Sequence, residues 1–372
     1  MNGVHMESVK SPARRLAVAG LSLVLALGLL GFLSCAGKAQ TAKPNETFRP
    51  LYPVRVHDKW GYIDTAGALV VKPRFDSAGD YAWRRHAAVS DAKTHKWGFI
   101  DQTGRFVIPP QFDLAGHFAE GLCAVGFGQP LLGTWGYIDT TGKFVIKPQF
   151  GGAWAFYAGR AVARVGNAET GKYGFIDTTG KFVIPPQFDF ASSYFEGLAS
   201  VGVGEFKTRR FGYIDSTGRF AIAPRFELAG SFYEGLAAVV ETLTNKWGYI
   251  DRTGRFVIAP RFGEAFRFSG GLGAVEDWGT YKWGFVDRTG RYVIAPQFKS
   301  AYGFYEGLAA VQDTLTEKWG YIDTTGKLVI EPQFRQAEEF HGGRALVYVD
   351  YWASRTFGYI DKTGRFVWGP TK

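Results

Sequence analysis

Apolar residues recur along this chain in short runs separated by turn residues. Within the segment from Phe304 to Phe334, the runs are Leu308 to Val311, Trp319 to Ile322 and Leu328 to Ile330. Alternation inside such runs, without a stretch of helical period, is typical of β-strands. The pattern therefore predicts three short antiparallel strands. It also predicts that Trp319 and Tyr321 share one face of the second strand, with Ile322 on the other.

The same group of runs is repeated nine times, and each copy is marked by an aromatic residue followed by glycine. These pairs begin at Trp60, Trp97, Trp135, Tyr173, Phe211, Trp247, Trp283, Trp319 and Phe357. Their spacing of 36 to 38 residues indicates one supersecondary unit copied along the chain. A single unit of this size is too small to be stable, so neighbouring units must share their aromatic faces. The glycine inside the strand predicts a close approach of another ring or backbone.

An aspartate with a glycine three residues later follows the second strand of each unit. Representative pairs are Asp139 with Gly142, Asp177 with Gly180, Asp251 with Gly254, and Asp323 with Gly326. This spacing predicts a hairpin loop in which the carboxylate accepts hydrogen bonds from turn amides and the glycine adopts a positive φ. The aspartates are therefore interpreted as structural rather than catalytic residues.

A proline follows the third run of each unit, and in every unit except the last a phenylalanine stands two residues beyond it. Proline lacks the amide donor of a strand, so we expect the third strand to end there. The phenylalanine, as at Phe112 and Phe150, is expected to anchor the core between repeats, where burial contributes roughly 1.5–3 kcal/mol.

These motifs together resemble the WG, or KWG, repeat family of bacterial proteins. The resemblance rests on the Lys-Trp-Gly-Tyr-Ile-Asp runs at Lys246 and Lys318, the Asp-x-Thr-Gly turns, and Glu-Gly-Leu-Ala at Glu196, Glu234 and Glu306. It covers about residues 50 to 370. The family resemblance implies an all-β repeat array and implies no common activity.

We therefore expect an all-β array of about nine three-stranded antiparallel units. Propellers typically have about four to eight blades, and this chain starts and ends in phase with its repeat. No terminal strand is left over to close a ring by exchange. An open, twisted superhelix is favoured on these grounds, and a closed propeller-like ring is the alternative.

The N-terminal segment reads as a targeting signal. Basic residues precede an apolar stretch from Leu16 to Leu33, which is followed by Ser34 and Cys35. This resembles a bacterial lipoprotein signal peptide over residues 1–34, and the resemblance implies cleavage before Cys35 and lipid attachment to its sulfur. An uncleaved anchor helix and an ordinary secretory signal are the alternatives. All three place the repeats outside the cytoplasm, and the lipoprotein reading implies the outer membrane or cell surface in a double-membraned bacterium.

Residues 35–49 are small, polar and aperiodic, which predicts a flexible tether before the repeat array of residues 50–372. The only cysteine besides Cys35 is Cys123, in an apolar run. We interpret it as a small core residue, with a reactive thiol as the alternative.

The net charge of +9 is partly patterned, because a basic residue follows the turn glycine in most units. These residues are Arg105, Lys143, Lys181, Arg219, Arg255, Arg291, Lys327 and Arg365. A stripe of this kind suits an anionic glycan, lipid head groups or an acidic partner. The alternative is that the cations provide solubility and discourage edge pairing. Nucleic acid is not expected, because charge alone favours it.

Catalysis is not indicated by any constellation of polar residues. The six histidines occupy different phases of the repeat, and none has ligand spacing with cysteine or carboxylates. The Glu-Gly motifs lack a second carboxylate at a fixed offset, as paired acid–base chemistry requires. We expect no cofactor, no metal and no enzymatic activity.

The loop between the first and second strands differs in every unit, and variable loops on a rigid scaffold usually carry binding. Aromatic residues outside the repeat pattern are the candidates: Trp154, Trp278, Tyr281, Tyr351 and Trp352. Such rings anchor sugars and proteins, or they cover their own loops. The sequence favours a lipid-anchored, extracytoplasmic binding or scaffold module with a protein or anionic glycan partner. The alternative is an envelope spacer without a specific ligand.

Overall fold

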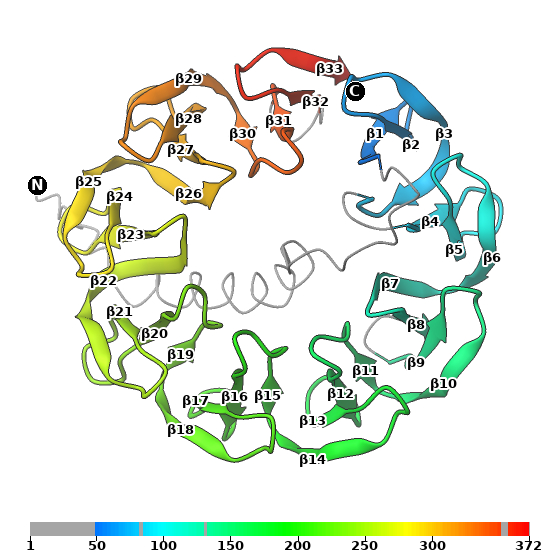
Figure 1. Ribbon diagram of the computed structural model, residues 1–372, viewed down its shortest axis with the longest axis horizontal. Helices are drawn as coiled ribbons and strands as arrows, with labels where there is room; N and C mark the ends of the chain where they lie inside the picture. Colours follow the sequence, from blue (N-terminus) through cyan, green and yellow to red (C-terminus); the bar gives the residue numbers. More distant parts are fainter. Residues whose placement is uncertain (1–48, 82–84, 130–131, 351–355, 372) are drawn as a thin grey trace, which may run out of the picture. The chain divides into compact units, whose positions relative to one another are not determined.

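The computed structural model describes residues 49–81, 85–129, 132–350 and 356–371. These residues belong to one compact unit, Phe48–Lys372. The predicted signal peptide, Cys35 and the tether up to residue 48 lie outside the described residues. All regular elements in the described ranges are β-strands, and they form nine radial blades (Figure 1).

Each complete blade is a four-stranded antiparallel meander that runs from the centre of the ring to its rim. In blade 5 the inner strand is β15 (Phe190–Ala191), followed by β16 (Ala199–Val203), β17 (Arg210–Ile214) and the outer strand β18 (Phe220–Phe226). The short inner strands face the middle of the ring, and strands such as β14 and β18 form its circumference (Figure 1).

The other blades follow the same order. Blades 1 to 3 contain β1 (Tyr52–Val56), β2 (Lys59–Ile63), β3 (Leu69–Ala78), β4 (Ala87–Asp91), β5 (Trp97–Ile100), β6 (Phe106–Phe112), β7 (Leu114–Ala119), β8 (Leu122–Phe127), β9 (Thr134–Asp139) and β10 (Phe144–Phe150). Blades 4 and 6 contain β11 (Gly152–Ala153), β12 (Ala161–Val165), β13 (Lys172–Ile176), β14 (Phe182–Phe188), β19 (Leu228–Ala229), β20 (Ala237–Val240), β21 (Trp247–Ile250) and β22 (Phe256–Ser269).

Blades 7 to 9 contain β23 (Leu272–Asp277), β24 (Trp283–Val286), β25 (Tyr292–Phe298), β26 (Ser300–Tyr305), β27 (Leu308–Gln312), β28 (Trp319–Asp323), β29 (Leu328–Phe334), β30 (Gln336–Ala337), β31 (Ala345–Tyr348), β32 (Phe357–Ile360) and β33 (Phe366–Thr371). Strands β3 and β22 are long because each forms the outer strand of one blade and the inner strand of the next.

The all-β repeat array is confirmed, but two local expectations are corrected. The units have a fourth, inner strand, which the sequence concealed because it pairs over as few as two residues, as in Phe190–Ala191. The third predicted strand also continues through its proline. In blade 5, Phe211 pairs with Phe226 and Tyr213 with Ile222, so a bulge around Pro224 removes the proline from the ladder.

The bulge also explains the glycine of the aromatic-glycine pair. A Cβ built on Gly212 would lie 2.5 Å from the Ile222 carbonyl oxygen and 2.7 Å from the Pro224 nitrogen. The same backbone approach recurs at the equivalent glycines. The predicted close approach is therefore confirmed, and the approaching group is the outer strand's backbone.

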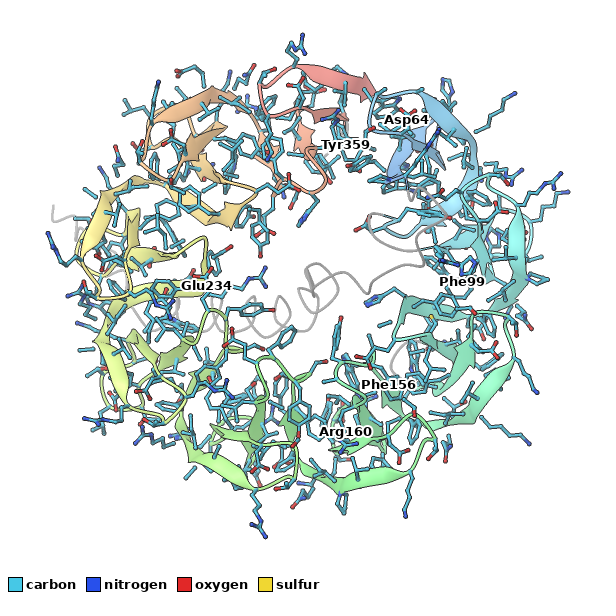
Figure 2. The ribbon with its side chains drawn as sticks, viewed as in Figure 1. Asp64, Phe99, Phe156, Arg160, Glu234 and Tyr359 are labelled. Atoms are coloured by element: carbon cyan, nitrogen blue, oxygen red, sulfur yellow. The ribbon has the colours of Figure 1, made fainter. Side chains whose placement is uncertain are left out.

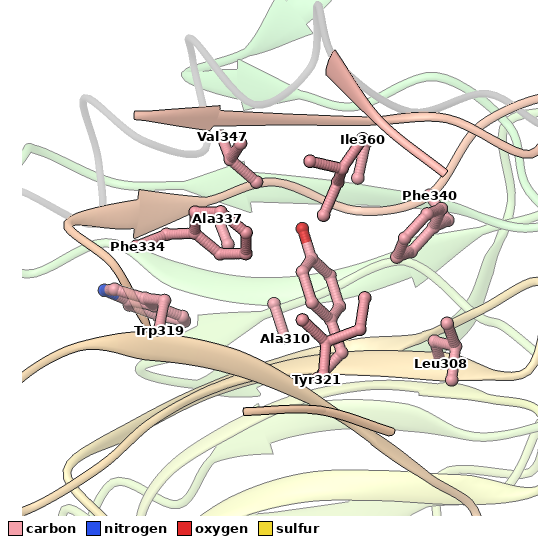
Figure 3. Close-up of a cluster of buried hydrophobic side chains, with 11 residues drawn as sticks. Leu308, Ala310, Trp319, Tyr321, Phe334, Ala337, Phe340, Val347 and Ile360 are labelled. Carbon is pink, nitrogen blue, oxygen red and sulfur yellow. The ribbon is translucent and has the colours of Figure 1, made fainter. Parts of the chain in front are cut away.

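The core lies between blades, not inside them. Trp319 and Tyr321 of blade 8 pack with Phe340, Val347 and other residues of blade 9 (Figure 3). Ile322, on the opposite face of the same strand, packs against blade 7. The predicted division of faces is confirmed, and each blade therefore depends on both neighbours.

Other core residues also lie at the boundaries between blades. Phe112 and Phe150 are buried at successive boundaries between blades, as their position in the repeat predicted. Cys123 is buried in the cluster between blades 2 and 3, in agreement with its interpretation as a core residue.

Blades 9 and 1 contact each other, and this closes the ring. The Tyr52 hydroxyl donates to the Gly342 carbonyl at 2.9 Å, and the Tyr359 hydroxyl donates to the Pro53 carbonyl at 3.1 Å. Tyr52 also packs with Tyr359 in a shared core cluster. The closed propeller-like ring, the alternative expectation, is the arrangement observed in place of the favoured open superhelix. Among the described residues no strand is exchanged, and side-chain hydrogen bonds to backbone carbonyls and ring packing join the two blades.

Candidate binding surfaces

The ring has two faces, and each carries a different set of connections. We call the side with the turns between inner and second strands, and between third and outer strands, the turn face. The side with the loops between second and third strands is the loop face. Contacts support this division: Lys362, in one kind of turn, donates to the Glu306 carbonyl in the other kind at 2.8 Å.

The turn aspartates hold the hairpins on the turn face. The Asp139 carboxylate accepts hydrogen bonds from the Thr141 amide at 2.9 Å, the Thr141 hydroxyl at 2.6 Å and the Lys143 amide at 3.1 Å. Gly142 has φ of 87°. The Thr141 hydroxyl and these amides lower the pKa of the Asp139 carboxyl. The equivalent bonds recur at Asp177, Asp251 and Asp323, while Gly180, Gly254 and Gly326 also have positive φ.

The basic residues that follow the turn glycines are exposed in every one of the eight blades that carry them. Each directly precedes an outer strand, so it lies at the edge of the turn face. Their exposure leaves them available to anions and equally to solvent.

On the loop face, the lysine before the aromatic-glycine pair forms an ion pair in blades 1, 2 and 4. Lys172 Nζ lies 2.5 Å from Asp189 Oδ1, and Lys59 Nζ lies 2.6 Å from Asp76 Oδ1. Each acid directly follows the core phenylalanine of its blade. The side chains are partly exposed, so each pair contributes at most about 1 kcal/mol.

Apolar side chains protrude from the loop face on four successive blades. Their exposed fractions are 61% for Phe206, 93% for Leu243, 62% for Tyr281 and 91% for Leu315. They belong to the loops of blades 5, 6, 7 and 8. Exposed apolar residues that gather on one face mark interaction surfaces more often than scattered ones do.

Two of the predicted binding residues lie on this surface. Trp278 is 39% exposed, and Lys246 Nζ lies 5.0 Å from its ring centroid. Tyr281 lies in the same loop. Trp154, by contrast, is on an inner segment and packs against Tyr173 with ring centroids 5.5 Å apart. Tyr351 and Trp352 lie outside the described residues.

On the inner rim of the turn face, glutamates form hydrogen bonds between neighbouring blades, which the sequence did not predict. Glutamates of the Glu-Gly motif reach the equivalent turn of the next blade. Glu120 accepts from the Ala158 amide at 2.7 Å and the Gly159 amide at 2.8 Å. Glu234 accepts likewise from the amides of Gly270 and Gly271, at 2.8 and 3.0 Å.

The same contact joins two further pairs of blades. Glu306 bonds the amides of Gly342 and Gly343 at 2.6 and 2.9 Å, and Glu196 bonds the Gly235 amide at 2.9 Å. Figure 2 shows Glu234 on the inner part of its blade. The regular recurrence of Glu-Gly was the available signal, but a lone acid gave no indication of its partner in the next repeat.

Beside these glutamates, rings from successive blades form an aromatic belt. Its members are Tyr157, Phe195, Tyr233, Tyr305 and His341. The Phe195 and Tyr233 ring centroids are 5.1 Å apart. In blade 7 the Arg267 guanidinium completes the belt, 4.5 Å from the Tyr233 ring and 5.3 Å from the Tyr305 ring. A cation between two rings is favourable on both sides.

Two carboxyl groups have pKa values raised into the neutral range. Burial raises the pKa of Glu339 to about 7, against the opposing effect of Arg267. His341 Nε2 lies 3.7 Å from the Glu339 carboxylate. Burial, with Glu264 and Asp277 nearby, raises the pKa of Glu276 to about 7. Glu339 therefore changes charge near neutral pH beside the aromatic belt.

Within the described ranges, no cluster of three or more histidine, cysteine, aspartate or glutamate residues is arranged to hold a metal ion. The same residues contain no helix with the length and apolarity needed to span a membrane.

Radial four-stranded meanders around a central axis define a β-propeller, here with nine blades. The chain belongs to the WG containing repeat family, whose repeat matches residues 60–82, 97–128, 135–167, 173–205, 211–241, 247–281, 283–313 and 319–351. No curated protein matches the sequence.

Solved structures show the likeness of fold alone. A crystal structure of a eukaryotic initiation factor aligns with 86% of this chain and 95% of its own, with a TM-score of 0.61 and 11% identity. The β-propeller domain of the Trilobed protease from Pyrococcus furiosus aligns with 77% of this chain and 99% of its own, with a TM-score of 0.36 and 11% identity. TolB from Acinetobacter baumannii aligns with 66% of this chain and 78% of its own, with a TM-score of 0.33 and 14% identity.

Proposed function

We propose that this protein is a lipid-anchored, extracytoplasmic binding module without catalysis, and that it contacts a protein partner through the loop face of blades 5 to 8. The observation that carries the proposal is the set of apolar loop tips at Phe206, Leu243, Trp278 with Tyr281, and Leu315. They protrude on one face of consecutive blades. Blade 5, for example, is packed on both sides by its neighbours.

A protein partner suits this surface better than a glycan. Leucine and phenylalanine tips gain free energy by leaving water, roughly 25 cal/mol per Å² of buried apolar area. They offer no hydrogen bonds to sugar hydroxyls. Trp278 and Tyr281 add rings with a polar end, which are common anchors at protein interfaces.

The residues around Cys35 support the proposed anchor, and the length of the tether behind it suits such a role. A flexible tether of residues 35–49 would span roughly 20 Å on average. The ring would then remain close to a membrane while its loop face turned toward partners. Labelling cells with a palmitate analogue tests this part, because wild type should incorporate label and Cys35→Ala should not.

The binding part is tested by affinity capture from the cell envelope with the full chain. The test variant combines Phe206→Ser, Leu243→Ser and Leu315→Ser, and the control combines Thr178→Ser, Thr217→Ser and Thr324→Ser on the turn face. Loss of a specific envelope protein from the first variant alone supports the proposal. Capture of the same proteins by all three chains would contradict it and favour a spacer without a specific ligand.

A further inference from the structure

The turns on the inner rim each present two consecutive backbone amides to the preceding blade. In blades 4, 7 and 9 both amides bind one carboxylate, with N–O distances from 2.6 to 3.0 Å. In blade 6, Gly235 donates to Glu196. Successive amides in such a turn form an anion-binding nest. The structure therefore shows that these turns bind glutamate carboxylates.

Where the structure describes the whole inner turn of the preceding blade, two nests receive no carboxylate, because that blade lacks the glutamate. Ala158 of blade 4 stands where a glutamate would reach Glu196 and Gly197 of blade 5. Gly270 of blade 7 stands where one would reach Glu306 and Gly307 of blade 8.

The backbone of these two nests already has the binding conformation. Glu196 and Gly197 have φ of 49° and 79°, and Glu306 and Gly307 have φ of 50° and 88°. The occupied turn at Ala158 and Gly159 has φ of 52° and 71°. All four residues of the two nests are exposed to solvent.

Cations add to the positive potential of the blade 5 nest. A Cβ built on Gly197 would lie 3.4 Å from Arg252 Nη2, so this guanidinium sits beside the nest. Arg160, on the neighbouring blade 4 (Figure 2), acts electrostatically on Asp177 of its own blade and on Tyr194 across the boundary. Its Nε is buried without a hydrogen-bond partner among the described residues. At the blade 8 nest, Lys362 Nζ lies 3.2 Å from Glu306 Oε2, so its charge is already paired with that carboxylate.

We propose that the nests of blades 5 and 8 bind carboxylate side chains of an acidic peptide segment on a partner protein. A peptide is favoured over an acidic glycan because the bound examples are all glutamate side chains. The rings of Tyr157, Phe195 and Tyr233 also flank the blade 5 nest, where they suit the apolar parts of a peptide. This second site lies on the turn face and does not depend on the loop-face function.

The test supplies the missing carboxylate from within the protein. Ala158→Glu should fill the blade 5 nest, and Gly270→Glu the blade 8 nest, since glutamates at this position in other blades adopt the same positive φ. Ala158→Gln is the neutral control. Gln187→Glu, on the exposed outer strand of blade 4, adds the same charge without reaching a nest.

Binding is measured by calorimetry of the full chain with a hexaglutamate peptide, and hexaglutamine and an oligogalacturonate serve as comparison probes. We expect each single glutamate variant to lose one hexaglutamate site relative to wild type and the double variant to lose two, with at least tenfold weaker binding overall. Ala158→Gln and Gln187→Glu should keep both sites. Ala158→Glu should also raise the melting temperature, which shows that the nest is filled rather than damaged.

Several outcomes would overturn the proposal. Equal binding of hexaglutamate and hexaglutamine by wild type would exclude a carboxylate site. Unchanged hexaglutamate binding in a stabilised double variant would place the site elsewhere. Binding of the oligogalacturonate alone would replace the peptide by an acidic glycan.

Discussion

Arg344 of the last blade donates from Nε to the carbonyl oxygen of Thr65 in the first blade, at 2.8 Å and 279 residues apart in the chain. Thr65 lies in the aspartate turn of blade 1, and Arg344 follows the inner-rim turn of blade 9. Lys362 and Glu306 make the same kind of turn-to-turn contact between blades 9 and 8. The boundary that closes the ring therefore resembles the boundaries inside it.

The closing boundary should control local opening of the first and last blades. We expect the double variant Tyr52→Phe, Arg344→Ala to speed hydrogen exchange in β1 and β33, because two sets of bonds between these blades are removed. The free energy of unfolding should fall by about 1–3 kcal/mol. The control Tyr213→Phe removes one similar bond, to Gly230 between blades 5 and 6. Faster exchange in β1 and β33 of the control, or unchanged exchange in the double variant, would argue against this assignment.

The glycine of the aromatic-glycine pair should tolerate no side chain. A Cβ on Gly284 would lie 2.6 Å from the Ile294 carbonyl oxygen and 2.8 Å from the Pro296 nitrogen. Gly284→Ala should therefore destabilise the protein by at least about 2 kcal/mol in urea unfolding. Gly303→Ala is the matched control on the next blade, where the nearest atom would be 3.6 Å away. Comparable losses in both variants would remove the steric explanation.

The contribution of Glu339 to stability should fall as pH rises from about 4.5 to about 7. Its pKa is raised from 4.5 to about 7 in the folded protein, so the folded state retains a proton that the unfolded state has lost. Glu339→Gln should remove this component, and it should stabilise the protein at pH 8 relative to wild type. The effect should be about 1–2 kcal/mol, since the side chain is 25% exposed and partly screened.

Chemical denaturation of wild type and Glu339→Gln at pH 4.5, 6 and 8 checks the sign. The difference between the two proteins should grow with pH. A constant difference would mean that Glu339 does not titrate differently in the two states. Glu276 has a similar raised pKa, so Glu276→Gln should show the same direction.

Arg267 should stabilise the aromatic belt through its charge. Arg267→Gln should lower the free energy of unfolding by about 1 kcal/mol, because the cation contacts two rings. It should also move the pH profile of Glu339 upward, since Arg267 lowers the pKa of that carboxyl. Arg267→Lys should restore part of both effects. An unchanged pH profile in Arg267→Gln would contradict the electrostatic link.

The repeat period and the alternation of residues were enough to predict the strands, their faces and the core. Trp319, Tyr321 and Ile322 show this well, because burial on alternate sides follows directly from a period of two. The inner strand at Phe190–Ala191 was missed because two residues carry too little pattern. The strand through Pro224 was misjudged because a bulge satisfies the ladder around the proline.

Ring closure and the inner rim could not be predicted because both depend on contacts between repeats. Curvature decides whether blade 9 reaches blade 1, and no local residue encodes it. Glu234 likewise gains its role from two amides in the next blade. The variable loops, by contrast, were located from the sequence, although their exposed leucines were overlooked beside the more conspicuous aromatics.

Because side chains join blades 9 and 1, the chain's ends could lie equally well at some other boundaries between blades. Among the described residues no strand crosses the boundary between blades 9 and 1, so a circularly permuted chain could open at any other boundary that no strand crosses, which excludes those spanned by β3 and β22. Units could accordingly be gained or lost by whole-repeat duplication wherever the curvature still allows the circle to complete itself. In such a protein, the number of blades and the binding partners can change while the contacts between neighbouring blades stay the same.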